Sequence, residues 1–136
     1  MATSTYLSNP VCEINSVDVT DQVSASTFTR VIEALESTSF GKTARVYTAG
    51  LENSTMTLTM YNSFASTETY ATLAALVGTS TTVTIKPTSA ATSATNPKST
   101  LTGCYLETLP IVNAALGALD TIDIVFTGGV YSVATA

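Results

Sequence analysis

The chain has no histidine and no tryptophan, and only 11% of its 136 residues are charged. Histidine is the commonest general base in enzymes, so its absence removes the usual basis for acid–base catalysis. The two cysteines, Cys12 and Cys104, are far apart and form no Cys-x-x-Cys or Cys/His pattern of a zinc site. We interpret them as buried core thiols, with a disulfide conceivable in an exported protein. The sequence predicts no enzyme, metal or cofactor.

The carboxylates do not change this prediction. Asp120 and Asp123 are three residues apart on an extended segment, so they tend to lie on opposite faces. Asp18 and Asp21 share a turn, but two carboxylates fall short of the six or more oxygens that Ca²⁺ prefers. We therefore expect no catalytic acid–base pair.

The formal net charge of −5 and the pI of about 4.3 disfavour a protein that grips phosphates with a basic patch. No stretch approaches the roughly 20 apolar residues that span a bilayer, so we expect no membrane insertion. Residues 1–10 are small and polar, and they predict a flexible N-terminal lead-in. Because they lack the pattern of a secretory signal peptide, we expect the protein to be made in the cytoplasm. A surface with so few charges suits a subunit of a regular assembly, in which neighbouring copies of the protein cover that surface.

Alternation of polar and apolar side chains predicts antiparallel strands, most clearly over residues 55–61 and 119–127. A long strand is expected over residues 24–35. Strict alternation puts Arg30 on its apolar face, so either the head of Arg30 reaches an acid or a bulge shifts the register. Shorter strands are expected at 11–14, 81–85, 101–109 and 130–133.

One helix is expected over about residues 66–77, where apolar side chains recur at helical spacing. The stripe consists of Tyr70, Leu73, Ala74 and Val77, with Ser66 or Thr67 as N-cap and Gly78 after the last turn. The element order predicts a single domain over residues 1–136. Its fold class is mainly β, an antiparallel β-sandwich or barrel with this flanking α-helix.

Residues 34–53 separate two strand-like runs and are too many for a tight turn. Long connections inside a compact domain are uncommon, and they are usually functional or disordered. This one also carries apolar side chains. We predict a long hairpin arm over about residues 37–52 that becomes ordered against another molecule, with an unpartnered surface hairpin as the alternative.

The segments in order are the hairpin STFTRVIEALESTSFGKTARVYTAGLENSTMTLTMY, the helix TETYATLAALVGTS, the strands TTVTIKPTSAATSATNPKSTLTGCYLETL and the closing LPIVNAALGALDTIDIVFTGGVYSV. In element order and composition, over nearly the whole chain, they resemble bacteriophage major tail tube proteins of the long, non-contractile (siphophage) type. From the sequence given, we expect the chain to depart from that family by lacking an immunoglobulin-like domain after Thr127.

The resemblance implies a structural protein of the virion tail, assembled in the host cytoplasm. Its subunits would close into hexameric rings, each giving one sheet to a continuous β-barrel, and the rings would stack into a tube that conducts DNA during ejection. Its partners would be copies of itself, other tail proteins, and DNA that passes without specific binding.

Two sets of site residues follow from this reading. The arm would contact the adjacent ring through Phe40, Lys42, Arg45, Val46, Tyr47 and Leu51. The hydroxyl-rich strand faces would line the lumen through Thr27, Thr29, Glu33, Thr55, Thr57 and Thr59. A capsid decoration protein, or an exported β-sandwich binding module or adhesin, is the alternative function.

Overall fold

The computed structural model of the protein describes residues 9–136, so most of the expected lead-in, residues 1–8, lies outside the described part. Between residues 9 and 136 it consists of antiparallel strands with one α-helix, which confirms the predicted fold class. The elements are β1 (Val11–Ile14), β2 (Val17–Asp18), the 3-10 turn η1 (Thr20–Gln22), β3 (Val23–Thr29), β4 (Ile32–Glu36), β5 (Tyr47–Glu52), β6 (Thr55–Tyr61), α1 (Thr69–Leu73), β7 (Ser80–Lys86), β8 (Lys98–Leu106), β9 (Thr121–Thr127) and β10 (Val130–Ala134).

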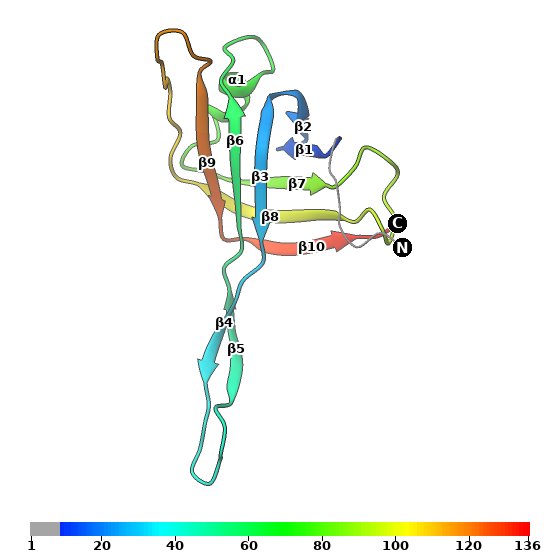
Figure 1. Cartoon of the computed structure of the whole chain (residues 1–136), viewed down its shortest axis with the longest axis vertical. Helices are drawn as coiled ribbons and strands as arrows, with labels where there is room; N and C mark the ends of the chain where they lie inside the picture. The colour runs from blue at the N-terminus through cyan, green and yellow to red at the C-terminus, as the bar shows by residue number, and fades with distance from the viewer. Residues whose placement is uncertain (1–8) are drawn as a thin grey trace.

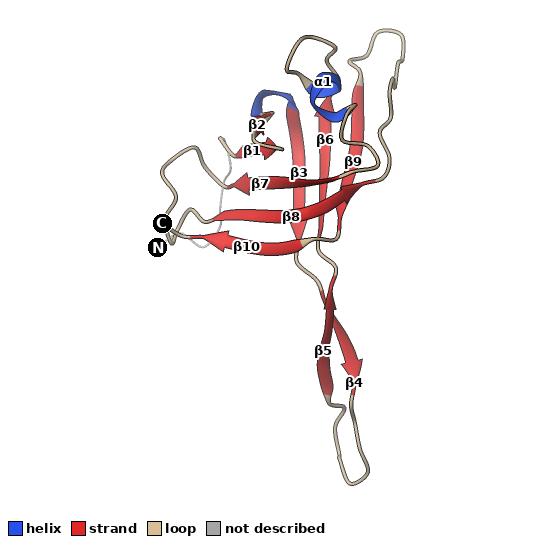
Figure 2. Cartoon of the chain, turned by 180° about the vertical axis from the view of Figure 1, so that it is seen from behind, coloured by secondary structure: helices blue, strands red, loops and turns tan. Residues whose placement is uncertain are grey.

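The strands of the body form two layers that cross each other (Figures 1 and 2). One layer holds β3, β6 and β9, and the other holds β1, β7, β8 and β10. A single hydrogen-bonded path joins them in the order β2-β1-β7-β8-β9-β6-β3, while β10 pairs with β8. β8 belongs to both layers, because residues 98–102 pair with β10 whereas Tyr105 and Leu106 pair with β9.

The core lies between the two layers and is built by strict alternation. Met56, Leu58 and Met60 on β6 are fully buried, and they are register partners of Phe126, Ile124 and Ile122 on β9. Val83, Leu101, Leu106 and Leu73 close the core from the other layer and from α1. Alternation therefore sends every second side chain of β6 and β9 inward and leaves the others on an outer face.

Both cysteines are buried and form no disulfide, as the sequence predicts for core thiols. Desolvation, with a smaller contribution from the Asp18 and Glu13 carboxylates, raises the pKa of Cys12 to about 12. Desolvation also raises the pKa of Cys104. Both thiols therefore stay protonated and unreactive at neutral pH.

The predicted helix over residues 66–77 is too long, because α1 spans only Thr69–Leu73. Glu68 is the N-cap residue, without a side-chain cap bond. Of the predicted stripe only Leu73 is buried, and Val77 forms a bridge to Leu106 on β8. This pairing competes with further helical turns, so the apolar spacing overstates the helix.

The predicted long strand over residues 24–35 is also wrong, because it breaks at residues 30 and 31 into β3 and β4. β4 pairs with β5 in a separate two-stranded sheet. This hairpin projects from one end of the body (Figure 1), so the arm comprises residues 32–52 and starts earlier than the predicted residue 37.

The corner between β9 and β10 requires glycine. Gly129 has a φ of +85°, and a Cβ on it would lie 2.5 Å from the Thr102 carbonyl oxygen and 2.8 Å from the Cys104 nitrogen. Its neighbour Gly128 has a φ of +77°, but a Cβ on Gly128 would have no atom within 4 Å. Because Gly129 has no Cβ, the corner can lie in close contact with the backbone of β8, at the point where the pairing of β8 changes from β10 to β9.

These neighbouring glycines give a matched test of the corner. Gly128→Ala adds only the left-handed backbone strain, about 1–2 kcal/mol. Gly129→Ala adds the same strain and a backbone clash, so we expect its loss of unfolding free energy to exceed that of Gly128→Ala by at least about 1 kcal/mol. Urea unfolding followed by circular dichroism measures the difference; equal losses would show that the close approach at Gly129 is unimportant.

Candidate assembly surfaces

The outer face of β3, β6 and β9 is a polar grid, which we call the threonine face. Strand register sets three rows across it: Ala25, Thr59 and Asp123; Thr27, Thr57 and Val125; Thr29, Thr55 and Thr127. The structure thus brings together five of the six residues predicted to line a lumen. All nine positions are exposed or half-buried, so no layer of the body covers this face, although Glu107 and Thr108 lie beside its β9 edge.

Asp123 is the one charged side chain among these nine positions. Its Oδ1 accepts a hydrogen bond of 2.7 Å from Thr59 Oγ1 on the neighbouring strand. Asp123 was not among the predicted lumen residues, although the alternation that buries Ile122 and Ile124 also places it outward. The face therefore offers hydroxyls, methyl groups and one carboxylate, without a cation.

Glu33 does not join this face. It lies on β4 in the arm. The strand is interrupted at residues 30 and 31, so alternation counted from β3 no longer tells which way the side chains of β4 point. Arg30 Nε lies 3.6 Å from Glu52 Oε1, and its guanidinium stacks 4.7 Å from the Tyr131 ring centroid. The head of Arg30 thus reaches an acid, one of the two outcomes expected for this residue.

The arm carries all six predicted contact residues. Phe40, Lys42, Arg45 and Val46 lie in the loop between β4 and β5, whereas Tyr47 and Leu51 lie on β5. No residue between 31 and 49 is buried, and Phe40 is fully exposed. The loop nevertheless has internal bonds, including an Arg45 Nη1 to Glu36 Oε1 contact of 2.8 Å. The arm therefore exposes apolar groups on an organised hairpin.

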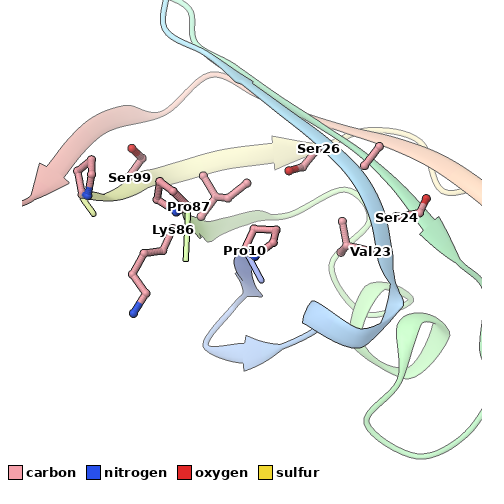
Figure 3. Close-up of a pocket in the computed structure, with 10 residues that line it drawn as sticks. Pro10, Val23, Ser24, Ser26, Lys86, Pro87 and Ser99 are labelled. Atoms are coloured by element: carbon pink, nitrogen blue, oxygen red, sulfur yellow. The ribbon is translucent and has the colours of Figure 1, made fainter. Parts of the chain in front are cut away.

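Three strands of the body have an edge that no described strand pairs with. β2 and β3 are the two ends of the hydrogen-bonded path, and β10 pairs only with β8. An open groove of about 360 Å³ runs beside β3 (Figure 3), lined by Val23 and Ser26 on one side and by Pro10, Pro87 and Ser99 on the other. Unpaired N–H and C=O groups at such an edge are a template for another chain.

Within residues 9–136, no helix has the length and apolar character needed to cross a bilayer. Asp18, considered above with Asp21 for a cation, instead accepts hydrogen bonds from the backbone and the hydroxyl of Thr20.

No family model matches the chain, and no curated protein matches its sequence. Solved structures are similar in fold. A chain in the cryo-EM structure of an extracellular contractile injection system, the PVC sheath/tube terminator in its extended state, has a TM-score of 0.70 at 9% identity, over 98% of this chain and 100% of that one.

Two further structures cover similar lengths. A chain of the anti-feeding prophage cap, a tube-terminating cap, has a TM-score of 0.66 at 11% identity, over 100% of this chain and 95% of that one. A chain in the tail of an empty gene transfer agent particle, from helical refinement in C6 symmetry, has a TM-score of 0.54 at 12% identity, over 84% and 83%. The chain therefore has the mainly β, antiparallel fold found in these tail and tube-terminator structures.

Proposed function

We propose that the protein is a structural subunit of a phage-like tail, which closes into hexameric rings that stack into a tube for DNA. The observation that carries this proposal is the arm. It is a hairpin without a buried residue between positions 31 and 49, it presents apolar side chains to solvent, and it stands on a fold shared with tube structures. Such a segment contributes nothing to the core of its own subunit, so it suits contact with another subunit.

Ring closure accounts for the unpaired edges of β3 and β10. Pairing between neighbouring copies removes exposed edges, and closed rotational symmetry is the usual way in which identical subunits achieve this. A neighbour at the β3 edge would also cover the apolar part of the groove. The sixfold number is supported by the C6 symmetry of the similar gene transfer agent tail.

In this arrangement the threonine face lines the channel. Attraction to DNA grows with each lysine or arginine that neutralises a phosphate. The nine positions of the face hold no such cation, and Asp123 repeats in every copy. DNA then passes a surface of hydroxyls and carboxylates without being held, so the protein acts as a conduit and does not act as an enzyme.

We further propose the non-contractile tail type, which rests on the sequence resemblance, since the fold also occurs in a contractile injection system. A tube terminator is a second candidate, because two of the similar structures contain terminators or caps. The exposed arm favours a stacking subunit over one that ends a tube. Capsid decoration and adhesion remain the rival functions.

Electron microscopy of the purified protein tests the proposal. We expect tubes of stacked rings at high protein concentration, because the arm and both sheet edges are then covered. Single rings that never stack would favour the terminator. A monodisperse monomer by light scattering would contradict a tube subunit and favour decoration or adhesion.

Removing the arm separates folding from stacking. Ile32 and Glu52 are register partners, so an Asn-Gly turn can replace residues 33–51 between them. We expect unfolding free energy to change by less than about 1 kcal/mol, because the removed side chains are exposed or half-buried. Tubes should no longer form.

Leu58→Ala is the matched control for the folding measurement, since it empties part of the core and should cost about 2–5 kcal/mol. Urea unfolding and negative-stain images give the two readouts. Normal tubes from the trimmed protein would refute the role of the arm.

Asp123→Lys tests the channel. It changes the charge of the threonine face by two units in every copy, so assembled tubes should retain a short labelled DNA duplex. Retention should fall at least about tenfold between 50 and 200 mM salt, because counterion release drives such binding. Co-sedimentation of tubes with the duplex measures it.

Glu33→Lys is the matched control, with the same charge change on the arm. It should retain no more DNA than the unmodified protein. If Glu33→Lys tubes hold the duplex and Asp123→Lys tubes do not, then the threonine face does not line the channel.

A further inference from the structure

The end of the body opposite the arm (Figures 1 and 2) also exposes apolar side chains. We call it the far end and define it as residues 62–70 and 111–120. Leu116 is fully exposed there and Leu119 is 77% exposed. Ile111, Val112 and Phe64 are likewise exposed, and the Phe64 ring lies 5.1 Å from that of Tyr70. Gathered apolar side chains of this kind mark an interaction site.

Hydrogen bonds hold the two far-end segments together. Asn62 Nδ2 donates to the Ile111 carbonyl at 2.8 Å and to Asp120 Oδ2 at 3.0 Å. The Asn113 backbone donates to Asp120 Oδ1 at 3.0 Å, and its Nδ2 donates to the Thr121 carbonyl at 2.8 Å. Polar groups thus organise this loop while Leu116 and Leu119 point away from any core. The apolar side chains are therefore available to a partner.

The tip of the arm and the far end differ in charge. The arm, residues 32–52, holds three glutamates as well as Lys42 and Arg45, and Glu36 pairs with Arg45. Within the loop at its tip, residues 37–46, there are the two cations and no acid, whereas the far end has Glu68 and Asp120 and no lysine or arginine. Lys42 at the tip therefore complements the far-end acids in charge, and both ends expose the apolar side chains that favour association.

The arm is long enough to bridge two copies. From Arg30 to Phe40 the chain advances ten residues, which spans roughly 30 Å in extended form. Arm and far end lie at opposite ends of the long axis, on either side of β3 and β6 (Figure 1). An arm therefore cannot fold back onto its own far end, but it can reach the far end of a copy placed beyond it.

We propose that the arm of one copy docks on the far end of a second copy, with Phe40 and its neighbours against Leu116 and Leu119 and with Lys42 facing the acids. This rests on the proposed stacking function and adds the surface that receives the arm. The contact joins unlike surfaces, so it repeats without closing and lets rings add along one axis.

Cysteine cross-linking between two singly substituted proteins tests the contact. Ser39→Cys marks the arm loop and Ala115→Cys marks the far end, both at exposed positions. The native thiols are buried, with raised pKa values, and give little background. After co-assembly and treatment with a short bis-maleimide, we expect the mixed dimer of Ser39→Cys and Ala115→Cys to be the main product.

Ser26→Cys, in the groove beside β3, is the competing site (Figure 3). A mixed dimer of Ser39→Cys with Ser26→Cys, or a dimer of Ser39→Cys with itself, would overturn the proposal, as would tubes without any cross-link. Micrographs of the same samples keep the two claims apart. If tubes form and only the 39–115 link fails, the stacking function stands and the docking surface is wrong; if the unmodified protein forms no tubes, both fall.

Discussion

The corner at which β8 changes partners controls the rest of the structure. Residues 98–102 of β8 pair with β10 and its last two residues pair with β9, so one strand belongs to both crossed layers. Gly129 permits this because its position lies against the backbone of Thr102 and Cys104, where no Cβ fits. The core is then closed on the β8 side, while β2, β3 and β10 are left as edges. The corner that completes the core therefore also leaves β10 with an edge available for association.

Low charge and exposed apolar side chains would be a liability in a free monomer. Most of the exposed large apolar side chains of this protein lie on the arm and at the far end, and the β3 groove has a partly apolar lining. The threonine face is different, because it is polar and carries one carboxylate. A subunit whose arm, far end and edges contact copies would keep only such a polar face toward a channel. The distribution of side chains thus matches a tube better than it matches an isolated binding module.

The sequence predicted the structure well where polar and apolar side chains alternate without interruption along a whole strand. The alternation in residues 55–61 and 121–127 predicted which side chains of β6 and β9 enter the core. It failed where an interaction distant in sequence decides the structure. Arg30 pairs with Glu52 and stacks on Tyr131, and the strand ends there, so Glu33 was placed on the wrong sheet. Val77 pairs with Leu106, so the helix is shorter than its apolar spacing suggests. Asp123 could have been found by the alternation rule and was overlooked.

The exposed arm also suggests that the proposed stacking is cooperative. An isolated two-stranded hairpin is marginally stable in water, and β4 pairs only with β5. Its Arg45 to Glu36 pair is largely solvent-exposed, with side-chain accessibilities of 72% and 45%. An exposed pair of this kind contributes little. A surface that covers the arm would therefore add to its stability. In the proposed tube, a single arm contact between free subunits would be weak. Several arms acting at once on one ring would instead reinforce each other, because each contact holds the next arm near its site.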